Sequence, residues 1–125
     1  MRAVVQRVSS ASVEVGGEPV GSIGPGLCAL IGVTHADTVA SADKLASKLW
    51  NLRVFEDPKG LMNLSAAELG LPVLVVSQFT LYADTTRGRR PSFVAAAPPN
   101  SAEALISRLV ESLRSLGATV ETGRF

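Results

Sequence analysis

Residues 73–93, VLVVSQFTLYADTTRGRRPSF, begin as an apolar segment and end in a cluster of arginines. The polar side chains and arginines of this segment are Ser77, Gln78, Thr80, Tyr82, Arg87, Arg89 and Arg90. A buried polar group costs about 1 to 3 kcal/mol unless something bonds to it. A substrate is one such partner, and arginines grouped around a glycine form a fork-shaped phosphate binder. This segment is therefore the leading candidate for a functional site.

The spacing alone leaves the chemistry of this segment open. Strand alternation predicts Ser77 and Phe79 on one face and Gln78 and Thr80 on the other, so the two hydroxyls need not act together. A threonine nucleophile needs an adjacent base, and none lies within sequence reach. The alternatives are a strand end whose side chains bond the backbone of a loop, and an arginine loop that is merely solvated.

The common catalytic and metal-binding templates are absent. With Cys28 as the only cysteine and His35 as the only histidine, the sequence cannot build a four-ligand zinc site, and we expect no metal or cofactor. His35 lies in the loop sequence GVTHAD, where a solvated residue is a commoner interpretation than a catalytic base. Cys28 lies in the apolar run LCALIGV and reads as a core residue. Neither a G-x-S-x-G elbow nor a Walker-type phosphate loop occurs.

Length and composition indicate one globular domain. The 125 residues are 46% hydrophobic but only 5% aromatic, which argues against a platform of stacked nucleic-acid bases. Because the net charge is only +1, contact with nucleic acid must be local and use clustered arginines. The start MRAVVQRVSS is a poor signal peptide, and no window approaches the ~20 apolar residues of a membrane span. We therefore expect a cytoplasmic protein with no membrane partner.

The first half of the chain predicts a hairpin, a central strand and a helix. Residues 2–15 and 18–24 read as strands joined at Gly16-Gly17. The nearly unbroken apolar run over 26–33 is typical of a strand covered on both faces. Asp37 is the expected N-cap of a helix over 38–52.

The second half predicts a second covered strand, a helix and a closing strand. They are expected over 72–82, 101–116 and 118–125, and turn residues fill 57–60. Asn100 and Glu103 imitate a capping box at the start of this helix, and Gly117 ends it. Strands and helices mix without strict alternation. The sequence therefore predicts a single α+β domain with a curved, mixed or antiparallel sheet and two packed helices.

Six motifs spread through the whole chain resemble one protein family. They are RAVVQRV at 2–8, NLRVFED at 51–57, MNLS at 62–65, VSQFTLYADTTRGRRPSF at 76–93, AAPP at 96–99 and VETGRF at 120–125. In this order they look like the D-aminoacyl-tRNA deacylases of the D-Tyr-tRNA deacylase type. The resemblance implies a barrel-like sheet and a homodimeric editing hydrolase. Such an enzyme cleaves the ester that joins a D-amino acid to tRNA, or glycine to tRNA(Ala), and spares L-aminoacyl-tRNA.

The resemblance also implies roles for particular residues. Ser77, Gln78, Phe79 and Thr80 would line the pocket for the terminal adenosine and the aminoacyl group. Backbone N–H groups there would stabilise the oxyanion, and the ribose 2′-OH of tRNA would assist the attack. An older view makes the threonine the nucleophile. Residues implied to bind tRNA, and not DNA, are Arg87, Arg89, Arg90, Met1 and Arg7.

The match departs from the family at its end. Family members continue past Gly123-Arg124-Phe125 with another strand and a Gly-Pro segment that excludes L-amino acids. We therefore expect a single deacylase domain over 1–125 without that segment, either because the protein ends early or because a tail is missing. Two other functions stay open, a non-catalytic RNA-binding module and a small-molecule acyl hydrolase.

Overall fold

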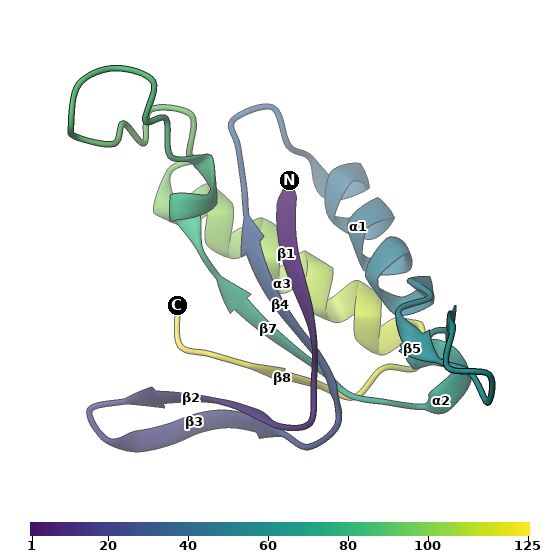
Figure 1. Ribbon diagram of the computed structural model, residues 1–125. Coiled ribbons are helices and arrows are strands. Elements are labelled where there is room, and N and C mark those ends of the chain that lie inside the picture. Colours follow the sequence, from purple (N-terminus) through teal and green to yellow (C-terminus); the bar gives the residue numbers. More distant parts are fainter.

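A four-stranded mixed sheet, covered on one face by two long helices, forms the centre of the molecule (Figure 1). The computed structural model describes residues 1–125. The strands lie in the order β1 (Arg2–Val8), β4 (Gly26–Gly32), β7 (Val73–Ser77) and β8 (Val120–Thr122), and the helices are α1 (Val39–Asn51) and α3 (Pro99–Ser115). β1 runs antiparallel to β4, whereas β4, β7 and β8 are parallel. Each parallel connection passes through a helix, as such crossovers require.

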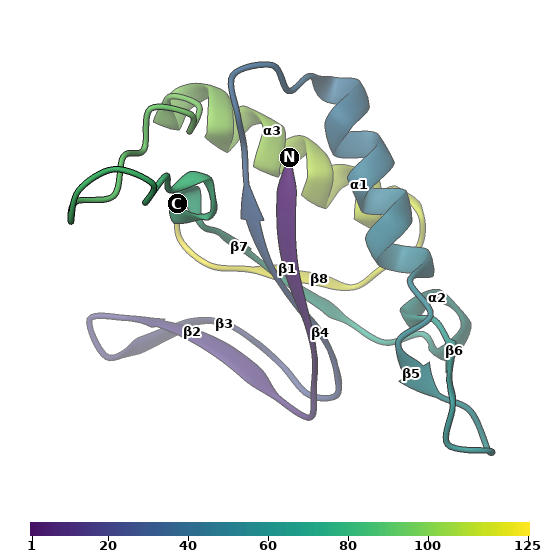
Figure 2. The ribbon, with the colours of Figure 1, turned by 45° about the horizontal axis from the view of Figure 1, so that its top comes forward.

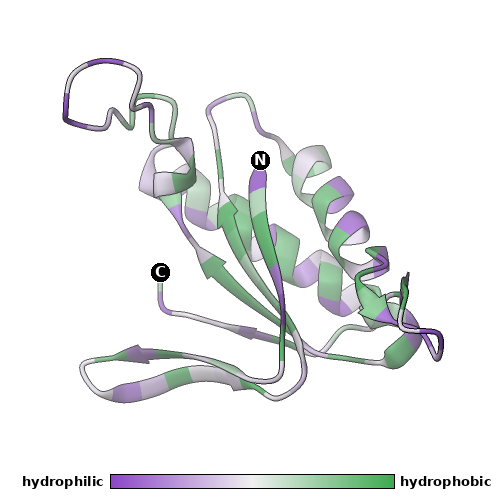
Figure 3. Cartoon of the chain, viewed as in Figure 1, coloured by the Kyte–Doolittle hydropathy of each residue, from purple (hydrophilic) through white to green (hydrophobic).

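The core lies between the sheet and the helices. Leu27 and Ile31 of β4 point into it and are almost fully buried, as are Leu49 of α1 and Leu109 and Leu113 of α3. Figure 3 shows apolar residues along β4 and β7 and on both helices. The expected central strand over 26–33 and the two packed helices are therefore confirmed.

Two small hairpins flank the central sheet. β2 (Ala11–Val15) and β3 (Glu18–Ile23) form the expected hairpin, in which Gly16 and Gly17 have positive φ angles of 59° and 82°. β5 (Phe55–Glu56), β6 (Met62–Leu64) and the short helix α2 (Ala66–Leu69) project at the other side (Figure 2). The expected α+β fold with a mixed sheet is confirmed, and the three sheets remain separate and do not close into a barrel. No helix has the length and apolar character needed to cross a bilayer.

Both predicted helix starts need correction. Thr38, not Asp37, is the N-cap of α1, because the Asp37 carboxylate bonds the Thr34 N–H and the Met1 amino group instead. The Asn100 capping box does not form. α3 begins earlier, at Pro99, a residue whose missing N–H suits the first helical position. Gly117 follows the helix end with φ of 109°, as expected.

Gly26 offers a stability test of this packing. An added Cβ would lie 2.2 Å from the carbonyl oxygen of Pro72, a backbone atom that cannot move without its strand. We expect Gly26→Ala to lower the free energy of unfolding by about 3 kcal/mol and the melting temperature by roughly 10 °C. Gly24→Ala is the control, because a Cβ there meets nothing within 4 Å. Equal melting temperatures for the two variants in thermal denaturation would contradict this packing.

Candidate functional site

The polar segment begins where β7 ends. β7 stops at Ser77, and residues Phe79–Tyr82 form a 3₁₀ turn, η1, instead of continuing the strand. The Gln78 N–H still bonds the Ile31 carbonyl at 2.8 Å, and the Leu81 N–H then turns back to the Gln78 carbonyl at 3.2 Å. The predicted strand to residue 82, and with it the alternation of polar side chains between two faces, was therefore wrong.

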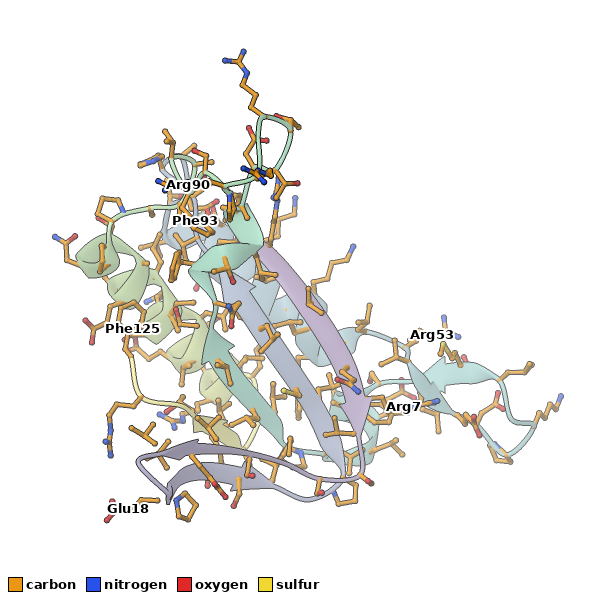
Figure 4. The ribbon with its side chains drawn as sticks, turned by 60° about the vertical axis from the view of Figure 1, so that its left-hand side comes forward. Arg7, Glu18, Arg53, Arg90, Phe93 and Phe125 are labelled. Carbon is orange, nitrogen blue, oxygen red and sulfur yellow. The ribbon has the colours of Figure 1, made fainter.

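A cavity of about 510 Å³ opens beside this strand end. Its walls come from β4, β7, η1, the segment 93–99, α3 and the chain end, and they comprise Ile31, Val33, Ser77, Phe79, Phe93, Ala96, Ala97, Pro98, Pro99, Ala102, Arg124 and Phe125. Phe93 lies near the loop of Arg90, and Phe125 lies nearer to α3 (Figure 4). Arg124 is the only ionisable side chain among these lining residues, so the walls supply neither an acid nor a base.

Of the four motif residues, the structure brings two to this cavity and pairs the other two with each other. Ser77 and Phe79 line it, and the Phe79 ring packs edge-on against Phe93 with centroids 5.2 Å apart. Gln78 and Thr80 contact each other, because the Gln78 side-chain amide donates a hydrogen bond to the Thr80 hydroxyl oxygen. Thr80 therefore has an amide as its partner and no base that could take its proton.

The backbone of η1 supplies hydrogen-bond donors. The first N–H groups of a helical turn have no acceptor within that turn, and Phe79 and Thr80 occupy these positions. Such amides can bond an ester carbonyl as it becomes an oxyanion. The start of η1 therefore leaves two backbone N–H donors without an acceptor in the turn.

The loop after β4 holds the opposite wall. Thr34 donates its hydroxyl to the Ala95 carbonyl, and the Val33 carbonyl accepts from the Ala97 N–H at 2.9 Å. The His35 Nε2 lies 2.7 Å from the Val94 carbonyl, to which it must donate because a carbonyl only accepts. His35 does not line the cavity, so it acts as a support of the wall. Sequence reasoning missed this wall because nothing in the chain signals contacts across some sixty positions.

The three arginines occupy an exposed loop that projects from the fold. Asp84 and Ser92 close its base through two backbone hydrogen bonds, of 2.7 and 2.8 Å. The Thr86 hydroxyl and N–H both donate to the Asp84 carboxylate, and these bonds lower the pKa of Asp84. Because its nearest acid is engaged in this way, the loop presents Arg87, Arg89 and Arg90 to solvent.

Met1 and Arg7 lie outside the cavity. The Met1 amino group forms an ion pair of 2.7 Å with Asp37. Arg7 stands at the other end of β1, where it donates to the Val54 carbonyl at 3.0 Å and lies beside the β5–β6 hairpin (Figure 4). The structure brings neither residue to the motif, and their binding roles stay predictions. No three side chains are grouped as metal ligands.

Comparison with known proteins finds similarity to one family. The sequence profile described as D-Tyr-tRNA(Tyr) deacylase matches residues 4–125. A D-aminoacyl-tRNA deacylase of Symbiobacterium thermophilum is 62% identical over 125 residues, which are 100% of this chain and 83% of the relative. One from Thermobifida fusca is 60% identical over 126 residues and covers 100% and 86% of the two chains.

Two solved structures share the fold. The c-Myc DNA Unwinding Element Binding Protein superimposes with a TM-score of 0.93 at 40% identity, covering 100% of this chain and 85% of that one. A probable eukaryotic D-amino acid tRNA deacylase superimposes with a TM-score of 0.81, covering 98% and 87% of the two chains. At 17% identity, the second likeness concerns the fold alone.

Proposed function

The chain belongs to the D-Tyr-tRNA(Tyr) deacylase family and is an editing hydrolase of D-aminoacyl-tRNA, and we propose that it cleaves the ester at the cavity beside η1. The observation that carries this placement is the cavity wall itself. Ser77 and Phe79 of the most specific family motif line an open, mainly apolar space whose only ionisable lining side chain is Arg124. Terminal adenosine and an amino acid side chain suit such a space.

The amides of η1 hold the ester carbonyl in the proposed mechanism. As water adds to the carbonyl carbon, negative charge develops on the carbonyl oxygen, and the N–H groups of Phe79 and Thr80 stabilise it. The carbon–oxygen bond to the ribose then breaks. The products are the free amino acid and tRNA, and no bond to the protein forms at any step.

The substrate supplies the proton transfer that the cavity lacks. His35 bonds a wall carbonyl and Thr80 bonds an amide, so neither activates water. The 2′-OH of the terminal ribose is adjacent to the ester oxygen and can assist both the attack and the departure. Assistance by the substrate accounts for a hydrolase site whose lining holds no carboxylate or imidazole and only Arg124 as an ionisable side chain.

One assay separates this function from its competitors. The protein is incubated with D-Tyr-tRNA(Tyr), L-Tyr-tRNA(Tyr) and the ethyl ester of D-tyrosine, and each release of tyrosine is followed over time. We expect rapid hydrolysis of the first substrate alone. Binding of tRNA without hydrolysis would favour an RNA-binding module, and cleavage of the ethyl ester would favour a small-molecule acyl hydrolase.

The arginine loop is proposed to bind the tRNA backbone. Replacing Arg87, Arg89 and Arg90 together by alanine should raise KM for tRNA about tenfold or more and leave kcat largely unchanged. The slope of log kcat/KM against log salt should fall by about 0.7 to 0.9 for each lost phosphate contact. Arg108→Ala, at an exposed pair with Asp43 on the helices, is the control. A collapsed kcat with an unchanged salt slope would contradict this role.

DNA is proposed not to be a partner. A structural relative is named for binding a DNA element, and the arginine loop could contact either backbone. In this proposal the cavity distinguishes the partners, because it takes the unpaired 3′ end of tRNA. Duplex DNA should therefore compete for the loop only weakly and should never be cut or retained at 0.15 M salt.

A homodimer is proposed from the face of the sheet that the helices leave open. Val4 of the edge strand β1 is 52% exposed there, and Cys28 and Leu30 of β4 are only half-buried. Burial already raises the pKa of the Cys28 thiol, so this side chain behaves as an apolar residue. A second copy would cover this face and the edge of β1. A monomer in light scattering at micromolar concentration would contradict the dimer.

Three further properties are part of the proposal. Glycyl-tRNA(Ala) is a second substrate, because glycine lacks any side chain that a pocket selective for D-amino acids would reject. L-aminoacyl-tRNA is excluded. The protein works in the cytoplasm, where its substrates are made and where its single cysteine stays reduced.

A further inference from the structure

An arginine from the first strand is attached to the turn that carries the candidate amides. The Arg2 Nη1 donates a hydrogen bond of 2.8 Å to the carbonyl oxygen of Leu81, and its guanidinium carbon lies 4.4 Å from the centre of the Tyr82 ring. The ion pairs of the chain use the Met1 amino group, Arg7 and Arg108 as their cations. The guanidinium of Arg2 is therefore directed to η1 and not to a carboxylate.

On its other side, the same turn packs closely against Gly32 of β4. Gly32 is paired with Arg2 in the β1–β4 register, and a Cβ on Gly32 would lie 3.0 Å from Leu81 Cβ and 3.1 Å from Tyr82 Cδ2. Tyr82 is only 8% exposed, and burial raises the pKa of its hydroxyl. η1 is thus held between the backbone of β4 and the side chain of Arg2.

We propose that Arg2 is a positioning residue for deacylation, because it fixes the turn whose Phe79 and Thr80 amides face the ester carbonyl. A single 3₁₀ turn has little stability of its own, and its last carbonyl groups receive no hydrogen bond from an N–H donor within the turn. Arg2 gives one of them a charge-assisted hydrogen bond and adds a cation–π contact to the following residue. The inference rests on the proposed function, since it assigns the turn a catalytic task.

The competing role for an exposed arginine in a tRNA enzyme is a phosphate contact. A lost phosphate contact raises KM and lowers the salt slope by about one, whereas a misplaced oxyanion donor lowers kcat and leaves the salt slope unchanged. The two roles therefore differ in which kinetic constant moves. They differ also in the free protein, where only a positioning residue protects the amides of η1 from hydrogen exchange.

The experiment compares Arg2→Met, Arg2→Lys and Arg108→Met by hydrogen exchange of the Leu81 and Ala83 amides, which bond within the turn, and by kinetics on D-Tyr-tRNA(Tyr). Arg2→Met keeps an apolar side chain of similar length but has no hydrogen-bond donor for the Leu81 carbonyl. We expect these amides to exchange roughly tenfold faster and kcat to fall by about tenfold at unchanged KM. Arg2→Lys should recover most of both, because one N–H and a positive charge are all that the turn uses. Arg108→Met should match the wild type.

Three results would overturn the inference. They are unchanged exchange of the Leu81 and Ala83 amides in Arg2→Met, faster exchange with an unchanged kcat, and a raised KM with a salt slope lower by about one. Failure of the proposed function looks different, because the wild-type protein itself would then leave D-Tyr-tRNA(Tyr) intact.

Discussion

D-Tyr-tRNA(Tyr) that ends in 2′-deoxyadenosine, with the ester on the 3′-oxygen, is expected to be hydrolysed about 10²- to 10⁴-fold more slowly than the normal substrate. The reason is the composition of the cavity, whose lining offers only Arg124 as an ionisable side chain. In the proposed mechanism the 2′-OH of the substrate assists proton transfer, and the deoxy substrate lacks this group. Single-turnover hydrolysis with excess protein measures this effect without interference from product release.

Two controls make this comparison specific. Binding of both tRNAs is measured with the non-hydrolysable amide in place of the ester, so that a loss of affinity is not counted as a loss of chemistry. The spontaneous hydrolysis of each ester is measured as well, and the accelerations by the protein are compared. Equal accelerations for the two substrates would contradict assistance by the 2′-OH and would require a base within the protein.

Gly32→Ala is expected to lower kcat by about tenfold to 10²-fold with little change in KM. A Cβ at this position would lie 3.0 Å from Leu81 Cβ and 3.2 Å from the Gln78 carbonyl oxygen. Neither atom is the end of a flexible side chain, so η1 must move by some tenths of an ångström. Catalytic donors tolerate such displacements poorly, since about 1 Å can cost 10²-fold.

Folding must be separated from catalysis in this variant. Gly24→Ala serves again as the control, because that glycine has free space around it. Both variants are assayed well below their melting temperatures, and their near-ultraviolet circular dichroism is compared with that of the wild type. A native Gly32→Ala protein with wild-type kcat would mean that the position of η1 does not matter for the reaction.

Sequence patterns predicted the parts of the fold that depend on local chemistry. Gly16 and Gly17 specify the hairpin because they supply positive φ angles, and the apolar run of β4 marks a strand buried at the centre of the sheet. The end of β7 was not predictable in this way. The side chains of residues 78–82 continue the strand pattern, but β4 stops at Gly32 and the neighbouring backbone then has no strand to pair with.

The candidate site was likewise predictable only in part. Ser77 and Phe79 follow from the family motif, and both line the cavity. The wall at Phe93 and its supports at Thr34 and His35 arise from tertiary contacts that no periodicity reveals. Arg2 could not be identified from the sequence either, since its contact with η1 depends on the strand register and not on its neighbours in the chain.

The identity of the nucleophile is the central claim, and Thr80→Ala tests it most directly. The variant and the wild type are each mixed in excess with D-Tyr-tRNA(Tyr), hydrolysis is followed in a single turnover, and quenched samples are examined by intact-protein mass spectrometry. We predict that Thr80→Ala keeps its rate to within about tenfold, because it loses a hydroxyl and no oxyanion donor, and that neither protein gains the mass of a tyrosyl group. A folded Thr80→Ala protein without activity, or a tyrosyl adduct on Thr80 of the wild type, would contradict the mechanism.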